Sequence, residues 1–491
     1  MSSGSLLQLW TDAKGRGGRS LCGGWAGRLW VLCLGAICGN AACQPSLDTR
    51  TAFLVNTLID SDRDLLAMRP LLLAQKYEQM AGGLQPFLRG TATVYYRDIS
   101  RYQDARAAVR HGPGAEQTQL YGDVHLENVG VTLDESGPLF DVIDFDATLP
   151  GPFAWDVRRA TLALRAALSV AEQPVETLDA ASAALVESYA QTLIRHASAP
   201  PEPVRRSSAT AGTIVTELIA DGQKRYEQKE ELSQYTEVRD GRRVLTRSDE
   251  RIDMPEPYRS ELGRWLESYR TTRRRGPGRA SQFVVLDAVQ RLGAGVASWP
   301  NLRFWVLVRG DEPVDSVASQ GGEWLLEFKE ERDPPQPIAW LGRGPLGSNA
   351  QRVFAGTRCL LASDGSEPDL GYVEAGSLSL QVRRVLRGRR DLDVLKLAER
   401  LRSGRYDAAD LRDLATTIGR LIAAGHARCG DAAALRRAIA GDAAAPDVAG
   451  FVADSLQAVR DDLRRLQRDF SLFRDARERL GPLLGAWPYP N

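Results

Sequence analysis

Apolar residues recur at helical spacing in several long stretches of the chain. Residues 50–82 follow this period and end at a glycine pair, so they predict helices. Residues 86–100 mix β-branched and aromatic residues with polar ones and favour neither helix nor strand. Helical spacing returns in residues 155–198, which end in a proline-rich stretch, and again in residues 391–480. Helices are therefore predicted on both sides of the strands described next.

Strands are predicted in two separate parts of the chain. Residues 115–133 and 138–148 each read as a short strand followed by a polar loop. Residues 302–308 and 323–331 look like the two arms of a β-hairpin, and residues 377–386 form a further predicted strand. With the helices, these patterns predict an α+β chain, and 491 residues are enough for two lobes.

Charged residues of the two signs balance each other. The chain has 63 Lys and Arg residues and 63 Asp and Glu residues, and its formal net charge is zero, so no nucleic-acid partner is expected. Residues 204–280 are locally polar and basic, and residues 271–279 within them predict a solvated loop. Only six of the 63 basic residues are lysines, which makes each lysine worth examining.

Residues 1–45 differ from the rest and predict a leader segment. A basic stretch without acidic residues is followed by the apolar residues 29–39 and by the small, polar residues 40–46, which is the layout of a secretory signal. The apolar part is too short for a comfortable membrane span. Cys43 follows two alanines as in a lipoprotein cleavage site, although Asn40 replaces the usual aliphatic residue. We expect export to the periplasm or lipid anchoring at Cys43; the alternative is a cytoplasmic protein with a basic tail.

Four of the six cysteines lie in this leader, and Cys359 and Cys429 remain in the body. The body has no Cys-x-x-Cys pair, so a zinc site is not expected. If the protein is exported, Cys359 and Cys429 could form one disulfide, which the sequence alone does not decide.

The strongest chemical signal is a set of polar residues after the first two predicted strands. Asp123, Asn128, Asp144 and Asp146 offer the hard oxygen ligands that Mg²⁺ prefers. One Asp that accepts a proton, together with an Asn and an Asp that hold the metal, is the layout of kinase-like phosphoryl transfer. On this reading Asp123 is the base and Asn128 and Asp144 are the metal ligands. The alternative is that these residues cap helices or bond their own turns.

Two further elements fit a phosphate site. Gly293 and Gly295 belong to a glycine loop before the predicted hairpin, whose backbone N–H groups could approach phosphate oxygens. Lys329, near the end of the second hairpin strand, is the candidate phosphate-binding cation, unless it pairs with the neighbouring Glu327 or Glu330. The catalytic loop would then precede the glycine loop and the lysine, which implies a permuted order.

Other polar residues have two interpretations each. Arg89 could face a phosphate or pair with a carboxylate, and Lys76 is the alternative phosphate-binding cation. His125 is expected to be a structural hydrogen-bonding residue rather than a metal ligand. Asp156 is expected near the N-terminus of a helix, and His426 is expected to be a buried histidine with satisfied hydrogen bonds.

Several of these segments resemble known families. "YGDVHLENVG" (121–130) resembles the catalytic loop of aminoglycoside- and choline-kinase-like phosphotransferases, and "VIDFD" (142–146) is similar to their metal-binding segment. Residues 50–480 resemble the bacterial domain-of-unknown-function 2252 family, through the segments "PFLRGTA", "IDFDATLPGPFAWDVRRATLAL", "LLEFKE" and "GHARCGD". Compared with that family, the glycine loop has Ala297 and Pro300 where glycine is expected.

The resemblance implies a two-lobed protein-kinase-like fold with a permuted strand order. Residues 86–200 would carry the catalytic loop and metal segment, residues 281–390 the small sheet, and residues 391–480 a helical part. It also implies Asp146 as a second-metal ligand or a supporting residue. We therefore expect an Mg²⁺-dependent phosphotransferase that uses ATP or another nucleotide, with a small-molecule or protein acceptor. The alternatives are an inactive kinase-like binding module and a metal-dependent phosphohydrolase.

Overall fold

The computed structural model describes residues 47–101, 116–196, 201–205, 208, 211–228, 230–274, 283–310, 322–336, 347–385, 388–440 and 447–486. Residues Leu47–Asn491 form one compact unit. Its mixture of helix and sheet confirms the predicted α+β class. The predicted leader, residues 1–45, lies outside the described residues, so its removal and the lipidation of Cys43 stay predictions. None of the described helices is both long enough and apolar enough to cross a membrane.

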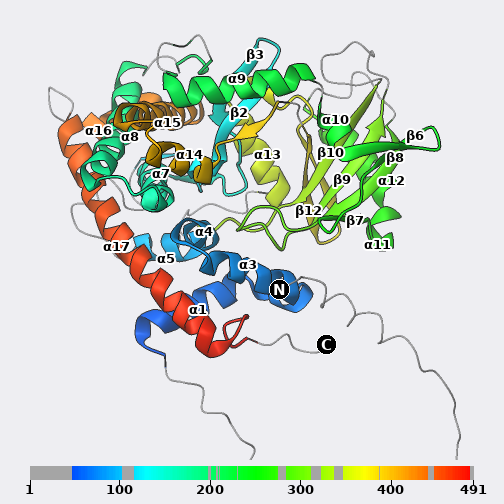
Figure 1. The fold of residues 1–491 in the computed structure, drawn as a ribbon, viewed down its shortest axis with the longest axis horizontal. Helices are drawn as coiled ribbons and strands as arrows, with labels where there is room; N and C mark the ends of the chain where they lie inside the picture. The colour runs from blue at the N-terminus through cyan, green and yellow to red at the C-terminus, as the bar shows by residue number, and fades with distance from the viewer. Residues whose placement is uncertain are drawn as a thin grey trace, which may run out of the picture. The chain divides into compact units, whose positions relative to one another are not determined.

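The predicted N-terminal helical region is confirmed, and it consists of several short helices. They are α1 (Thr49–Ser61), α2 (Arg63–Met68), α3 (Pro70–Ala81), α4 (Leu84–Gly90) and α5 (Ala92–Arg101). Asp48 caps α1 with its side chain, and Pro70 occupies the first turn of α3, where no N–H partner is lost. The mixed residues 86–100 are helical because Phe87, Tyr95 and Tyr96 pack into a core against the long helix α17 (Val448–Leu480) (Figure 1).

Each polar loop lies between two short strands. β1 (Gln117–Leu120) precedes the first loop and β2 (Val129–Asp134) follows it, after the 3-10 turn η1 (Leu126–Asn128). β3 (Gly137–Val142) precedes the second loop and β4 (Leu149–Pro152) follows it. The sequence predicted only the strand before each loop. β1 pairs antiparallel with β4, and β2 pairs antiparallel with β3 and with β13 (Arg390–Asp391), so both loops lie at the same end of these strands.

Helices surround these strands and form the largest core. They are α7 (Ala154–Ala167), η2 (Leu168–Val170), α8 (Val175–Arg195), α9 (Gly212–Gln228), α13 (Asn349–Leu360), α14 (Val394–Arg402), α15 (Ala408–Cys429) and α16 (Ala432–Ala440). α8 and α15 pack closely, since a Cβ on Gly419 would lie 2.1 Å from the carbonyl oxygen of Leu185. The disulfide Cys359–Cys429 joins α13 to the end of α15.

The second sheet has six antiparallel strands in the order β11-β12-β10-β9-β8-β7 (Figure 1). The strands are β7 (Arg251–Asp253), β8 (Val284–Arg291), β9 (Arg303–Arg309), β10 (Glu323–Glu330), β11 (Gly371–Ala375) and β12 (Leu378–Arg384). β9 and β10 confirm the predicted antiparallel pair, and β12 the further strand. One face packs its apolar side chains, such as Phe304 and Phe328, against α12 (Leu262–Thr272). The other face carries the charged residues discussed below.

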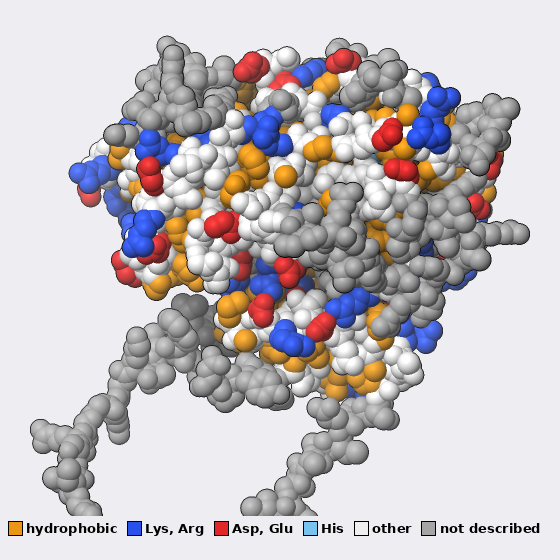
Figure 2. Space-filling view, turned by 180° about the vertical axis from the view of Figure 1, so that it is seen from behind, with side chains coloured by type: hydrophobic (Ala, Val, Ile, Leu, Met, Phe, Trp, Pro, Cys, Tyr) orange, Lys and Arg blue, Asp and Glu red, His pale blue; other side chains and the backbone are white. Residues whose placement is uncertain are grey.

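Residues 204–280 contain more regular structure than the sequence predicted. They include α9, α10 (Glu230–Tyr235), α11 (Glu256–Arg259) and α12, and a separate hairpin of β5 (Thr236–Arg239) and β6 (Arg242–Leu245). The predicted solvated loop at 271–279 is wrong at its start, because α12 continues to Thr272 and Arg273 is buried against Asp369. Figure 2 shows charged side chains of both signs scattered over the face seen there.

Candidate functional site

The predicted site residues face one large cavity. Its volume is about 1440 Å³, and its lining includes Asp123, Asn128, Asp144, Asp146 and Lys329. Arg89 and Gly295 also line it, as does Lys76, which is paired with Asp62 at 2.8 Å. Gly293 belongs to the same loop as Gly295 but does not line the cavity; its missing side chain leaves room for the ring of Trp299.

Strand register brings the two polar loops together. Val129 at the start of β2 pairs with Val142 at the end of β3, so Asn128 and Ile143 are the next residues on each side. The N–H of Ile143 donates to the carbonyl oxygen of Asn128 at 2.9 Å. Asn128 and Asp144 therefore lie at the same point of the sheet because of an ordinary antiparallel ladder.

A buried carboxylate holds the first loop in place. Asp156 in the first turn of α7 accepts hydrogen bonds from the N–H groups of Tyr121 at 2.6 Å and Gly122 at 2.9 Å. His426 lies behind it, with Nε2 3.0 Å from Asp156 and Nδ1 2.8 Å from the hydroxyl of Tyr189. His426 is thus a buried, satisfied histidine, as predicted. Asp156 does lie near a helix N-terminus, but it also holds the backbone of the first polar loop, which the sequence did not reveal.

Gly122 allows the two loops to approach each other. Its φ is +86°, and a Cβ there would lie 2.1 Å from the carbonyl oxygen of Ala147 in the second loop. Only glycine satisfies both the positive φ and this close approach. The close approach of the two loops therefore explains why the "YGD" motif has a glycine at this position.

Asp123 is held by an arginine through one of its two oxygens. Arg159 of α7, which is fully buried, donates from Nε to Oδ1 of Asp123 at 2.8 Å and from Nη2 to the carbonyl oxygen of Leu88 at 2.8 Å. In the described part of the chain, Oδ2 of Asp123 accepts no hydrogen bond. Burial raises the pKa of Asp123 above its ordinary value, although Arg159 opposes this shift. Asp123 is thus a fixed carboxylate with one oxygen available.

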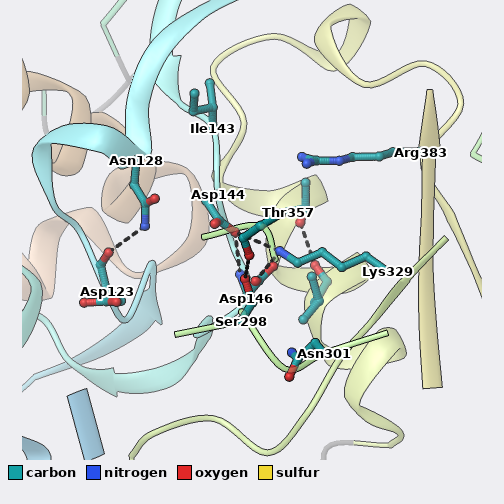
Figure 3. Close-up of polar contacts among 12 residues, drawn as sticks. Asp123, Asn128, Ile143, Asp144, Asp146, Ser298, Asn301, Lys329, Thr357 and Arg383 are labelled. Atoms are coloured by element: carbon teal, nitrogen blue, oxygen red, sulfur yellow. Dashed lines mark hydrogen bonds and ion pairs between the residues drawn. The ribbon is translucent and has the colours of Figure 1, made fainter. Parts of the chain in front are cut away.

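Asn128 is oriented by its amide. Its Nδ2 donates to the backbone carbonyl oxygen of Asp123 at 2.9 Å, which turns Oδ1 towards Asp144 (Figure 3). No described residue donates a hydrogen bond to this Oδ1. The side chain therefore presents an acceptor oxygen to the space between the two loops.

Lys329 bridges the two carboxylates of the second loop. Its Nζ contacts Oδ2 of Asp146 and lies 3.6 Å from Oδ1 of Asp144 (Figure 3). If Lys329 binds phosphate beside the metal site, it is expected near Asp144, and this is where it lies. The alternative partners are engaged elsewhere: Glu330 with Arg69, and Glu327 with arginines of the sheet.

Burial and charge act together on these three groups. Burial acts to lower the pKa of Lys329, but Asp144 and Asp146 outweigh it and raise that pKa. Burial likewise acts to raise the pKa of Asp144, but Lys329, hydrogen bonds from Asp146 and the charge of Arg383 together outweigh it and hold that pKa well below its ordinary value. Burial and then the Asp144 carboxylate raise the pKa of Asp146. Asp144 is therefore the more firmly ionised of the two carboxylates.

The donor set fits Mg²⁺ with few protein ligands. Oδ1 of Asn128 and the carboxylate of Asp144, whose side chain is 37% exposed, face the same space, and Asp146 lies next to them. Among the described residues, no group of three or more His, Cys, Asp or Glu side chains could hold a metal ion by itself. Mg²⁺ commonly binds through one or two carboxylates and completes its shell with water and phosphate oxygens. The residues present therefore fit an ion that arrives with a phosphate ligand.

Arg89 and His125 also line the cavity. Arg89 forms an ion pair with Glu127, whose carboxylate also accepts a hydrogen bond from Nε2 of Gln85 at 2.5 Å. Of the two interpretations of Arg89, the structure therefore shows the pairing with a carboxylate. The Nη2 of Arg89 is 4.0 Å from the Cβ position of Gly295, which places it against the glycine loop. His125 is buried, and its Nδ1 has no hydrogen-bond partner among the described residues, so the expected structural hydrogen bond is wrong for this atom. Burial and Arg89 lower the pKa of His125 well below its ordinary value.

Two residues that sequence analysis missed complete the site. Arg352 of α13 donates to the carbonyl oxygens of Asp146 at 2.9 Å, Thr148 at 2.6 Å and Arg332 at 2.9 Å, which ties the second loop to the end of β10. Glu331 is buried two residues after Lys329, and no residue in the described ranges forms a hydrogen bond with its Oε1. Burial and next Asp146 raise the pKa of Glu331 well above its ordinary value. The position of Glu331, two residues after the candidate Lys329, could have drawn attention to it. No local sequence pattern distinguishes Arg352 from the many other arginines.

Comparison with known proteins gives one match. No curated protein and no solved structure shows significant similarity to the chain. Residues 69–476 match the model of a family described as "uncharacterized protein conserved in bacteria" (DUF2252). This range includes every candidate site residue discussed above and most of the chain, and the protein therefore belongs to the DUF2252 family.

Proposed function

We propose that this protein is an Mg²⁺-dependent phosphotransferase that uses ATP or another nucleotide as its phosphate donor. The main observation behind the proposal is that Lys329 contacts Asp146 and Asp144. Lys329 and Asp146 are 183 residues apart in the sequence. Kinase-like enzymes combine a strand lysine for the phosphates, an Asp and an Asn for the metal, and a separate Asp for the acceptor hydroxyl. Residues of all four kinds line this one cavity.

The proposed roles follow from the contacts of each residue. Oδ2 of Asp123 would accept the proton of the acceptor hydroxyl, and Arg159 fixes the carboxylate for this task. A raised pKa makes Asp123 a better base than an ordinary aspartate. Lys329 would exchange its contact with Asp146 for the donor phosphates, to which it offers a compact positive charge.

Asn128 and Asp144 would hold Mg²⁺, with Asp146 as a second-metal ligand or a supporting residue. When bound, Mg²⁺ would neutralise negative charge on the transferred phosphate. The loop of Gly293 and Gly295 would cover the phosphates, and Gly295 is the member that lines the cavity. Arg89 would supply a further cation beside that loop once it leaves Glu127.

The order of elements supports a kinase-like fold that is permuted. The segment β8, glycine loop, β9, β10 with Lys329, and α13 has the order of strand, loop, strand, lysine strand and helix seen in kinases. Here it follows the catalytic loop instead of preceding it. One departure is clear: kinases pair the lysine with a helix glutamate, whereas α13 contains no acidic residue and Asp146 takes this place.

An inactive, kinase-like binding module is the second candidate. Two observations favour it: the ammonium of Lys329 is already paired with Asp146, and Ala297 and Pro300 replace glycines in the covering loop. Such a module would bind the nucleotide without transferring phosphate. A metal-dependent phosphohydrolase would instead release inorganic phosphate from a monoester.

We also propose that the protein works outside the cytoplasm. The disulfide Cys359–Cys429 is of a kind that persists in oxidising compartments, and the leader has the layout of a secretory signal. Membrane contact would occur only through a lipid on Cys43. The acceptor would be a small molecule or a protein, and the balanced charge gives no reason to expect nucleic acid.

The experiment that tests the function measures nucleotide binding and ADP production by the full chain, with and without Mg²⁺. Asp144→Asn should abolish Mg²⁺-dependent binding, whereas Asp123→Asn should keep binding and lose ADP production. Asp413→Asn changes an exposed aspartate on α15 and should alter neither. Binding without ADP production by the unmodified protein would favour the inactive module, and phosphate release from a monoester would favour the phosphohydrolase. No Mg²⁺-dependent binding at all would refute the proposal.

A further inference from the structure

The cavity-facing side of the six-stranded sheet carries cations directly beside one another. Lys329 on β10 pairs in register with Arg303 on β9 and with Gln381 on β12. Gln290 on β8 pairs with Phe304, so Arg291, the next residue, lies beside Arg303. All three cations line the cavity. Like charges opposite each other on neighbouring strands are destabilising, so this row of Arg291, Arg303 and Lys329 has a cost to the folded protein.

The two arginines of this cation row are only loosely engaged with the described part of the protein. Arg303 reaches Glu327 at 3.3 Å and the hydroxyl of Ser298 at 3.5 Å, both long contacts. The guanidinium of Arg291 makes no hydrogen bond or ion pair with any described residue and stacks on the ring of Trp305 at 4.6 Å. Burial, and to a lesser extent Arg303, lower the pKa of Arg291, which agrees with a cation that lacks a close anionic partner.

The next row of the sheet does not neutralise this charge. Glu327 pairs in register with Trp305 and Arg383, and it accepts hydrogen bonds from both as well as from Arg303. The single carboxylate of Glu327 thus accepts hydrogen bonds from two arginines, and it does not pair with Arg291 or Lys329. Lys329 is balanced by Asp146 and Asp144, which would be occupied by the metal in the active complex. Bound Mg²⁺ would therefore leave the cation row in need of an anion.

We propose that the cation row binds the phosphate chain of the donor, so that the site recognises the triphosphate and is indifferent to the nucleobase. This inference rests on the proposed function and names the class of donor: any nucleoside triphosphate, and inorganic tripolyphosphate as well. Neighbouring strands are about 4.8 Å apart, so three cations on three strands cover about 10 Å, a span that suits a chain of phosphates. Arg291 ends β8 immediately before the glycine loop, which puts the row beside the backbone that would cover the phosphates.

The inference is tested by titration calorimetry of the full chain in the presence of Mg²⁺. ATP, GTP and inorganic tripolyphosphate should bind with dissociation constants within about threefold of one another, and adenosine should not bind, if the phosphate contacts carry the affinity. Arg291→Gln should weaken ATP and tripolyphosphate by the same factor, about tenfold or more, for the loss of one charge-assisted contact. Arg291→Lys keeps the charge and should recover part of that affinity.

Arg309→Gln is the matched control. Arg309 lies on β9 as Arg303 does, but its half-exposed side chain pairs with Glu323 outside the cavity lining, so all affinities should stay unchanged. ATP binding at least tenfold tighter than GTP, without tripolyphosphate binding, would overturn the inference while the proposed function stands. Tripolyphosphate binding that Arg291→Gln leaves intact would also overturn it. If no nucleotide binds in Mg²⁺, the proposed function fails and the inference fails with it.

Discussion

Gly122→Ala offers the most direct test of how the two polar loops are held together. The new Cβ would lie 2.1 Å from the carbonyl oxygen of Ala147 and 2.7 Å from Nε2 of Gln336, whereas ordinary contact begins at 3.4 Å. The first and second loops must therefore separate by about 1.3 Å. Asp123 lies on one loop and Asp144 on the other, so their spacing changes by a similar amount. A misplacement of about 1 Å can reduce an enzymatic rate about a hundredfold.

The stability effect has two parts. Alanine at the φ of +86° costs about 1–2 kcal/mol, and the overlap with the second loop costs about 1–3 kcal/mol more. We expect the free energy of unfolding, measured in urea, to fall by about 2–5 kcal/mol. Gly404→Ala supplies the control, because Gly404 has a φ of +71° and no atom near its Cβ position, so it isolates the backbone part.

The activity assay distinguishes the effect of displaced loops from the effect of a less stable fold. The rate of the proposed phosphotransfer should fall about a hundredfold in Gly122→Ala under conditions in which it remains folded, while Gly404→Ala keeps the unmodified rate. The reasoning would be refuted if both variants lost the same stability and kept the same activity. In that case the close approach at Gly122 would have no role beyond its backbone conformation.

Three further predictions concern the cation, the disulfide and a buried acid. Lys329→Arg and Lys329→Ala should both weaken Mg²⁺-nucleotide binding with little change in circular dichroism; unchanged binding by Lys329→Arg would show that a point charge is not required. Replacing Cys359 and Cys429 by serine opens a loop closed over 70 residues and should lower the free energy of unfolding by about 4 kcal/mol, which urea titration measures; equal stability of both forms would show that the disulfide does not restrain the unfolded chain. Burial raises the pKa of Asp141 to about 6, so its protonated form stabilises the fold below the ordinary value of 3.8 and that contribution is lost as the pH rises to about 6. This loss should be on the order of 3 kcal/mol and should be missing from the pH dependence of Asp141→Asn, whereas the same pH dependence in both proteins would contradict the assignment.

The sequence predicted that Asn128 and Asp144 meet because each belongs to a polar loop after an apolar run, and the antiparallel pairing of β2 with β3 brings them together. Lys329 belongs to a different sheet, and its place near Asp144 follows from the proposed kinase-like arrangement rather than from a local pattern. The roles of Asp156, Arg159 and Arg352 could not be predicted in the same way. Their partners lie 20 to 270 residues away, and a buried arginine has the same local pattern as the many exposed ones.

For the fold as well, local patterns located some elements, whereas others depend on contacts between distant segments. Helical period located the N- and C-terminal helices, and short runs rich in aliphatic and aromatic residues located β9, β10 and β12. Residues 86–100 are helical because aromatic side chains bury themselves against α17, a tertiary effect that outweighs local preference. The cation row on the sheet depends on strand register, which places residues of β8, β9 and β10 side by side and is not visible in any one segment.

The position of β13 has a consequence for biosynthesis. The small sheet beside the candidate catalytic loop consists of β2, β3 and β13, and Arg390 and Asp391 of β13 pair with Val131 and Gly130, residues made about 260 positions earlier. A chain emerging from the ribosome would present the candidate catalytic hairpin with one strand edge open until the whole six-stranded sheet has been synthesised. Such unpaired edges favour aggregation, and late long-range pairing slows folding. Holding the chain unfolded until synthesis is complete, as export through a membrane requires, would protect this edge from premature pairing.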